Sequence, residues 1–128
     1  MSKISHILLK NPVVVPAGTK LNEAAKLMKK NKISSVLVSR NGRLAGIISV
    51  ADIMSAASES TRSDIPVDEV MQSPRLTINS DKWLHDAIVI FEDCKASCLN
   101  VIENGEKIGI IRADDVLHTY RFNNETQR

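Results

Sequence analysis

Two seven-residue segments of the chain end in a carboxylate at the predicted start of a helix. They are GIISVAD at residues 46–52 and GIIRADD at residues 109–115. A carboxylate only accepts hydrogen bonds, and the free N–H groups of a helix start favour a nearby anion, so the segments indicate binding chemistry. Ser49 and Asp52 also have the spacing of a capping box, which is a purely structural arrangement. Both interpretations of Ser49 stay open.

The second segment has an arginine, Arg112, where the first has Ser49. Arginine cannot accept a hydrogen bond from a helix N–H, and its charge is unfavourable beside the positive end of the helix dipole. We therefore expect an anion to compensate Arg112. Asp114 or Asp115 is one candidate, and a phosphate group of a ligand is the other.

No set of residues has the pattern of a catalytic or metal site. The sequence contains no P-loop, no dinucleotide-binding glycine fingerprint and no G-x-S-x-G motif, and its three histidines have no ligand spacing. Cys94 and Cys98 lack a second pair of ligands, which makes a poor zinc site. We expect both cysteines to be free, buried thiols, no metal, and no enzymatic activity.

The chain repeats itself, without a gap, at a shift of 63 residues. The shift aligns Gly46 with Gly109, Asp52 with Asp115, and Asn41-Gly42 with Asn104-Gly105. Such a repeat organises the whole fold. It predicts a first repeat at residues 1–58, a linker at 59–66, a second repeat at 67–122 and a C-terminal tail at 123–128.

Each repeat has the pattern of a strand, a helix, a hairpin and a second helix. Thr19 and Asp81 are candidate caps, and the apolar residues that follow recur at i, i+3, i+4 and i+7, which is typical of a half-buried helix. Asn-Gly between apolar runs predicts a hairpin. The expected strands lie at residues 13–15, 35–39, 43–48, 76–78, 98–102 and 107–111, and the expected helices include residues 21–28, 52–57, 84–91 and 115–122.

This order predicts an α+β fold of two β-α-β-β-α repeats. Two helices cannot cover both faces of a three-stranded sheet, so we expect the repeats to pack sheet to sheet with pseudo-twofold symmetry as one folded module.

In these features the chain resembles a CBS-domain pair, also called a Bateman module. The resemblance is carried by GIISVAD and GIIRADD, which are similar to the family's G-h-h-[ST]-x-x-D signature, in which h is apolar, by the Asn-Gly hairpins, and by Val67-Asp68-Glu69-Val70-Met71. It covers nearly the whole chain. It implies a regulatory module that binds an adenosine-containing ligand (AMP, ADP, ATP, NAD(H) or S-adenosylmethionine) between its repeats, with no obligatory cofactor.

The resemblance also implies roles for individual residues. The Asp that ends each segment would bind both ribose hydroxyls, and the residue three positions earlier would face sugar or phosphate. Two acceptor oxygens suit a cis-diol, which offers two donors. The implied ligand-binding residues are Val14, Ser34, Ile47, Ser49, Ala51 and Asp52 in the first repeat and Ser97, Ile110, Arg112, Asp114 and Asp115 in the second.

Two single residues carry further expectations. Asn100 falls in a predicted buried strand where the first repeat has Leu37, so it is either a rim residue of the cleft or a satisfied polar group of the core. Trp83 is expected on the solvent side of its helix.

Composition limits the partners. A net charge of +2 and a pI of 8.6, with no basic stripe interleaved with aromatics, do not indicate a nucleic-acid partner. Lys29, Lys30 and Lys32 are expected to be a solvated helix end. No apolar run is long enough for a membrane span, and we expect a cytoplasmic protein. Uncovered helix faces predict a homodimer, and a regulated enzyme or transporter would be its further partner. The alternative is an assembly module with vestigial ligand sites.

Overall fold

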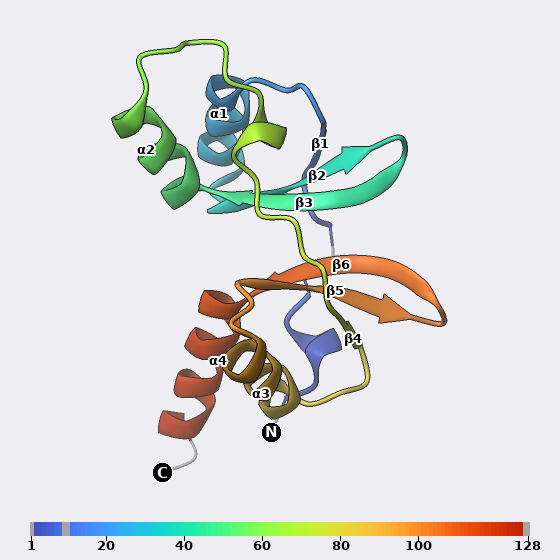
Figure 1. Cartoon of the computed structure of the whole chain (residues 1–128). Coiled ribbons are helices and arrows are strands. Elements are labelled where there is room, and N and C mark those ends of the chain that lie inside the picture. The colour runs from blue at the N-terminus through green and yellow to red at the C-terminus, as the bar shows by residue number, and fades with distance from the viewer. Residues whose placement is uncertain (1, 9–10, 127–128) are drawn as a thin grey trace. The chain divides into compact units, whose positions relative to one another are not determined.

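The computed structural model describes residues 2–8 and 11–126, and the chain forms two compact units (Figure 1). One unit is Asn11–Ser73, and the other combines Met1–Lys10 with Pro74–Arg128. Each contains a three-stranded sheet and two helices, in the predicted order strand, helix, strand, strand, helix. The α+β fold of two β-α-β-β-α repeats is therefore confirmed.

The Asn11–Ser73 unit contains the first sheet. Its strands, in spatial order, are β1 (Val14–Pro16), β2 (Ser35–Arg40) and β3 (Arg43–Ser49), with β1 parallel and β3 antiparallel to β2. The helix α1 (Leu21–Asn31) connects β1 to β2, and α2 (Val50–Glu59) follows β3 directly. A short 3₁₀ helix, Val67–Glu69, lies in the segment after α2.

The second unit repeats this topology. Its strands are β4 (Thr77–Asn79), β5 (Cys98–Glu103) and β6 (Glu106–Arg112), with α3 (Leu84–Cys94) between β4 and β5. The helix α4 (Ala113–Thr126) follows β6. A 3₁₀ helix, Ile4–His6, belongs to the same unit.

One face of each sheet packs against the helices, because successive side chains of a strand point to opposite faces. In the first unit this face presents Val36, Val38 and Ile48 to the apolar stripe of α1. The core of the second unit is built in the same way, from Ile78, Leu84, Ala87, Phe91, Leu99, Val101, Ile111 and Val116.

The Asn-Gly pairs form the predicted hairpins. All four turn residues have positive φ, with 54° and 78° at Asn41 and Gly42 and 51° and 80° at Asn104 and Gly105. Asparagine and glycine tolerate this conformation better than other residues, which is why the dipeptide marks the turn so clearly.

The compact units do not coincide with the sequence repeats, because the stretch around the start of each predicted repeat packs in the unit formed mainly by the other repeat. Ile65 and Val67 belong to the core of the first unit, and Ile4 belongs to the core of the second. The two stretches also make equivalent backbone hydrogen bonds. The Val67 N–H donates to the Thr19 carbonyl at 2.7 Å, and the Ile4 N–H donates to the Lys82 carbonyl at 2.8 Å. We call these two stretches, residues 2–8 and 65–72, the lead segments.

Several details of the sequence prediction were wrong. The residues that cap α1 and α3 are Lys20 and Trp83, because Thr19 and Asp81 lie in the preceding turns. The Thr19 hydroxyl donates instead to the Pro16 carbonyl at 2.7 Å. Both cysteines are free, but Cys94 is exposed at the end of α3, whereas Cys98 is buried in β5.

The remaining surface details agree with the sequence prediction. Trp83 is 43% exposed, and the Lys3 ammonium lies 5.4 Å from its ring centroid. Lys29 and Lys30 are exposed in the last turn of α1. Lys32 is the C-cap residue of α1 and has a left-handed backbone conformation. The Glu69 and Asp64 carboxylates raise the pKa of Arg62, Glu69 by the larger effect, and the ion pair with Glu69 joins the exposed linker to the lead segment beside it. None of the helices in the described ranges could span a membrane.

Candidate functional site

The start of α2 is closed by a reciprocal pair of hydrogen bonds between Ser49 and Asp52. The Ser49 hydroxyl accepts from the Asp52 N–H at 3.1 Å, and the Asp52 Oδ2 accepts from the Ser49 N–H at 2.9 Å. The capping-box interpretation of these residues is therefore confirmed. Ser49 is 3% exposed, whereas Asp52 is half-buried. Each carboxylate oxygen accepts more than one bond, so Asp52 keeps acceptor capacity beyond the cap.

Gln72 supplies a further donor to Asp52, and sequence reasoning missed it. Its side-chain Nε2 lies 3.2 Å from Oδ1 and 3.4 Å from Oδ2 of Asp52. Two backbone bonds of 2.9 Å each between Gln72 and Ile47 hold the glutamine beside β3. No local signal could have found Gln72, because the residue follows the linker in sequence and packs in the first unit only through the exchange of lead segments.

The first glycine of each signature segment makes room for a lead segment. A Cβ on Gly46 would lie 2.6 Å from the Met71 sulfur and 2.7 Å from the Gln72 carbonyl oxygen. A Cβ on Gly109 would lie 2.9 Å from a methyl carbon of Leu8. Glycine is required at position 46 because the backbone of Gln72 approaches the strand closely, whereas the Leu8 side chain beside Gly109 can move. The glycine of each signature segment therefore lies against a lead segment, and the aspartate of the same signature segment lies at the start of the following helix.

The other first-unit residues of the predicted site lie in two places. Val14 and Ile47 flank Leu37 in one row across the sheet, on the face opposite the helices. Ser34 lies at the start of α2, where its carbonyl accepts from the Val50 N–H at 2.9 Å, and Ala51 is exposed in the first turn. Ile47 and Ser49 are alternate residues of β3, so the row and the helix start adjoin.

In the second unit, Arg112 is compensated by Asp115. Arg112 Nε lies 3.1 Å from Oδ2, and a terminal nitrogen of the guanidinium lies 3.0 Å from Oδ1. The Arg112 side chain is 13% exposed and that of Asp115 is 54% exposed. Of the two internal candidates, Asp115 therefore makes the ion pair, while Asp114 is exposed in the first turn of α4. The two aspartates that end the signature segments thus have different surroundings.

Asn100 is the exceptional residue of the second sheet. It lies opposite Ile110, on the face away from the helices, and is 6% exposed. Its amide nitrogen donates to the Pro74 carbonyl at 3.2 Å, which fixes the orientation of the amide, and its Oδ1 is buried with no hydrogen-bond partner among the described residues. Asn100 is therefore a half-satisfied polar group next to a predicted ligand residue. Ser97 corresponds to Ser34, and its carbonyl accepts from the Ala113 N–H at 2.9 Å.

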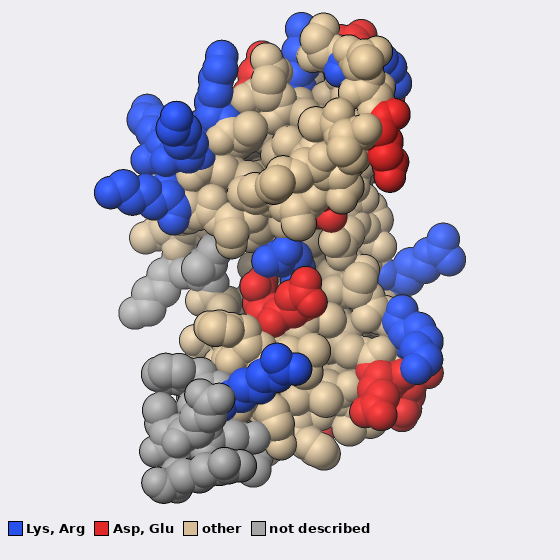
Figure 2. All heavy atoms as spheres, turned by 90° about the vertical axis from the view of Figure 1, so that its left-hand side faces the viewer, with Lys and Arg blue, Asp and Glu red and all other residues tan. Residues whose placement is uncertain are grey.

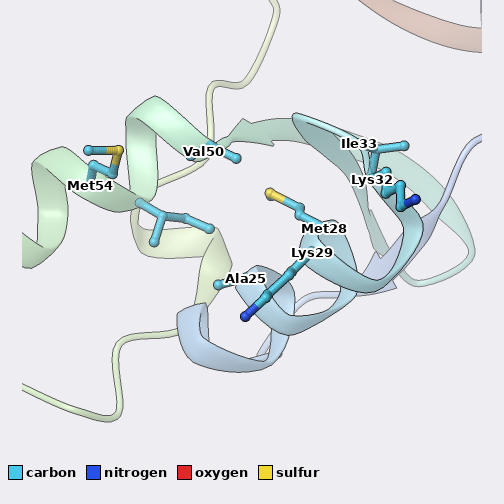
Figure 3. A pocket seen from close by; sticks show the side chains of 8 residues that line it. Ala25, Met28, Lys29, Lys32, Ile33, Val50 and Met54 are labelled. Carbon is cyan, nitrogen blue, oxygen red and sulfur yellow. The ribbon is translucent and has the colours of Figure 1, made fainter.

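A groove of about 460 Å³ lies between α1 and α2 of the first unit (Figure 3). None of the predicted ligand-binding residues lines it. Its apolar residues are Ala25, Met28, Ile33, Val50, Ile53 and Met54, and its charged residues are Lys29 and Lys32. We call it the α1–α2 groove. Within residues 2–8 and 11–126, no group of three or more His, Cys, Asp and Glu side chains could hold a metal ion.

Solved structures share this fold. A CBS domain protein of Pyrobaculum aerophilum, in complex with AMP, is similar with a TM-score of 0.69 and 21% identity, over 94% of this chain and 99% of that one. The CBS domain pair of protein MJ0100, in complex with 5′-methylthioadenosine and S-adenosyl-L-methionine, has a TM-score of 0.70 and 22% identity, over 96% and 98%.

Sequence comparison identifies the same family in both halves of the chain. An uncharacterized protein of Methanocaldococcus jannaschii is 32% identical over 116 residues, which are 90% of this chain and 38% of that protein. The chain therefore spans a little over a third of the length of that relative. The CBS domain model matches at residues 4–59 and again at 67–121, around the signature segments and the hairpins described above. The chain accordingly belongs to the CBS domain family, as a tandem pair.

Proposed function

We propose that this chain is a regulatory module that binds an adenosine-containing ligand at the signature segments of its CBS repeats and passes the binding event to a partner. The observation that carries the proposal is the repeated signature segment, whose carboxylate stands at the start of a helix in both units. A half-buried Asp52 with acceptor capacity to spare suits a ribose diol. The related structures named above hold AMP, 5′-methylthioadenosine and S-adenosylmethionine, which all contain adenosine.

The ligand-binding residues of the proposed sites are those expected from the sequence. In the first repeat, Asp52 would bind the ribose, with Val14 and Ile47 beside the base and Ser34 and Ala51 at the helix start. In the second, Arg112 would face the phosphate, and Asp115 would exchange part of its ion pair for the sugar. Charge-assisted hydrogen bonds of this kind contribute about 1.5–3 kcal/mol each.

A thermal-shift panel tests the proposal. Adenosine, AMP, ADP, ATP, NAD(H) and S-adenosylmethionine would be compared with GMP and with inorganic phosphate. A ligand that binds the native state at about 100 times its Kd stabilises it by about 2.7 kcal/mol, which raises Tm by several degrees for a chain of this size. No shift with any adenosine ligand would contradict the proposal.

A second candidate is an assembly module whose ligand sites are vestigial. It is favoured by the fact that both signature aspartates already have intramolecular partners, Ser49 and Gln72 for Asp52 and Arg112 for Asp115. The panel separates the two candidates, because a vestigial site would bind no member of it while the chain still associates.

We also propose that the module forms a homodimer and acts without catalysis of its own, in the cytoplasm. Exposed apolar side chains on the helices support association: Val50 and Met54 on α2, Val89 on α3 and Leu117 on α4 are 40–67% exposed. Light scattering at micromolar concentration, with and without nucleotide, tests it. A mass near that of the 14.1 kDa monomer in both conditions would exclude the dimer. To regulate an enzyme or transporter, the module must have two states that bind the ligand with different affinity, so that ligand binding changes the state that the partner meets.

A further inference from the structure

Asn100 and Thr77 place hydrogen-bonding groups in the second unit at positions where the first unit has none. Thr77, Asn100 and Ile110 form one row across the second sheet, on the face opposite the helices. The corresponding row of the first sheet, which contains Leu37, is entirely apolar. The polar residues of this row therefore distinguish the surroundings of the second signature segment from those of the first.

The backbone of the strand does not require asparagine at position 100. The Asn100 N–H donates to the Leu76 carbonyl at 2.9 Å, and the Leu37 N–H makes the equivalent bond to the Val13 carbonyl at 3.0 Å. Asn100 and Leu37 are both 6% exposed. Leucine therefore fits the same backbone and the same burial without leaving an oxygen unpaired. A buried oxygen without a partner needs an explanation other than the fold of the sheet.

The amide of Asn100 has a defined orientation. Its nitrogen donates to the Pro74 carbonyl at 3.2 Å, and its Oδ1 accepts no hydrogen bond from any described residue. An amide nitrogen carries two N–H groups, so the side chain still presents one acceptor and one further donor. With these two groups an asparagine amide recognises adenine in nucleic acids, because the 6-amino group donates and a ring nitrogen beside it accepts. A 6-oxo purine would place its own acceptor oxygen against Oδ1.

Asn100 adjoins the groups proposed to hold the phosphate and the ribose. Its strand partner Ile110 precedes Arg112 by two residues on β6, so these two side chains lie on one face, about 7 Å apart along the strand. Asp115 forms the ion pair with Arg112. The row is open to solvent at the β4 edge, where Thr77 is exposed. One nucleotide is long enough to contact the row and the ion pair together.

Charge does not select between purine nucleotides. Figure 2 shows Lys and Arg side chains together with Asp and Glu side chains on one face of the surface, and the net charge of the chain is only +2. AMP and IMP carry the same phosphate, so electrostatic attraction acts equally on both. Discrimination between them has to come from contacts with the base.

We propose that Asn100 is the residue by which the second-repeat site selects a 6-amino purine over a purine without that group. The Asn100 Oδ1 accepts from the 6-amino group, so the bound base supplies the donor that the amide lacks. The first-repeat site has Leu37 at this position and does not read the same edge of the base through that side chain. The inference rests on the ligand binding proposed above at the signature segments and adds its base selectivity.

A cycle of ligand and protein changes tests the contact. All chains carry Asp52→Ala, which weakens the first-repeat site so that the second can be measured. AMP and purine riboside 5′-monophosphate, which has hydrogen in place of the 6-amino group, are titrated calorimetrically into chains with Asn100 and with Asn100→Leu. We expect AMP to bind the Asn100 chain about tenfold or more tightly than the analogue, and both ligands to bind Asn100→Leu equally. IMP should bind the Asn100 chain more weakly than the analogue.

Asn79→Leu is the matched control. Asn79 is an exposed asparagine of β4 outside the row, and its replacement should leave the ratio of the two affinities unchanged. Equal affinities of the Asn100 chain for AMP and the analogue would overturn the inference without the need of a variant. An equal loss of both ligands in Asn100→Leu would also overturn it, because a purely structural residue would give that result.

Failure of the proposed function gives a different result. If no adenosine ligand binds the wild-type chain, ligand binding at the signature segments and this inference fail together. If AMP binds the wild type but no longer binds the Asp52→Ala chain, all binding belongs to the first repeat and this inference alone is overturned. The side-chain amide signal of Asn100 in NMR, identified by its absence from Asn100→Leu, should shift with AMP and much less with the analogue.

Discussion

Arg112 and Asp115, three residues apart at the start of α4, form an ion pair with two hydrogen bonds of 3.1 and 3.0 Å. The pair makes the second signature aspartate different from the first, which bonds to its own cap and to Gln72. Because Asp115 is more than half exposed, the pair itself contributes little to stability, about 0–1 kcal/mol. A ligand could therefore compete for either partner at small cost.

Arg112→Ala is expected to lower the affinity for AMP about tenfold and that for adenosine much less, because the guanidinium is proposed to face the phosphate. Isothermal titration of both ligands gives the comparison. Arg112→Lys retains the positive charge but cannot form the same two hydrogen bonds. Its affinity for AMP should therefore lie between that of the wild type and that of Arg112→Ala. Equal losses for AMP and adenosine would remove the phosphate role.

Asp52→Ala is expected to weaken adenosine-ligand binding about tenfold or more, because it removes charge-assisted bonds to the ribose. The change also opens the capping box, so the free energy of unfolding should fall by about 1 kcal/mol. Calorimetric titration and urea unfolding measure the two effects separately. Gln72→Ala serves as the control: it removes a competing donor from the same carboxylate, so affinity should be retained. An unchanged affinity in Asp52→Ala, with a cooperative melt, would leave Asp52 as a capping residue alone.

Asn100→Leu is expected to stabilise the protein by about 1 kcal/mol, because it removes a buried oxygen that has no hydrogen-bond partner. Leucine is the residue that the first repeat has at the corresponding position, Leu37. The reverse change, Leu37→Asn, should destabilise by about 2 kcal/mol or more. Urea unfolding of both variants is the measurement. A stability loss in Asn100→Leu would mean that its bond to the Pro74 carbonyl outweighs the unpaired oxygen.

Gly46→Ala is expected to destabilise the first unit by about 1–3 kcal/mol, because its Cβ would meet the backbone oxygen of Gln72 at 2.7 Å. Gly109→Ala is the matched control in the other unit. Its Cβ would meet only the end of the flexible Leu8 side chain, which can move. Thermal unfolding should therefore show the larger loss for Gly46→Ala, and equal losses would argue against the close approach of the Gln72 backbone as the cause.

The features that the sequence predicted are local ones. The Asn-Gly turns, the helix periodicity and the capping box of Ser49 and Asp52 each depend on residues a few positions apart, and all of them are present. The sequence also predicted that the partner of Arg112 is either a neighbouring carboxylate or a ligand phosphate. In the structure Arg112 forms an ion pair with Asp115.

What the sequence could not predict is long-range. Gln72 contacts Asp52, which lies 20 positions earlier in the sequence. Ile4 packs in the core of a unit whose main part begins only at Pro74. The composition of a lead segment does not indicate which unit it packs in, because both repeats have the same order of strands and helices. The repeat boundaries read from the alignment therefore differ from the bounds of the compact units.

The exchange of lead segments fixes an order of events during synthesis of the chain. The Asn11–Ser73 unit is continuous, so all of its parts have left the ribosome once Ser73 emerges, and domains generally fold in the order of their synthesis. Ile4 is made before the Asn11–Ser73 unit, whereas its core partners Leu84, Leu99 and Val116 are made after that unit. Residues 2–8 therefore cannot reach their native core partners until Val116 has been translated, long after the last residue of the Asn11–Ser73 unit.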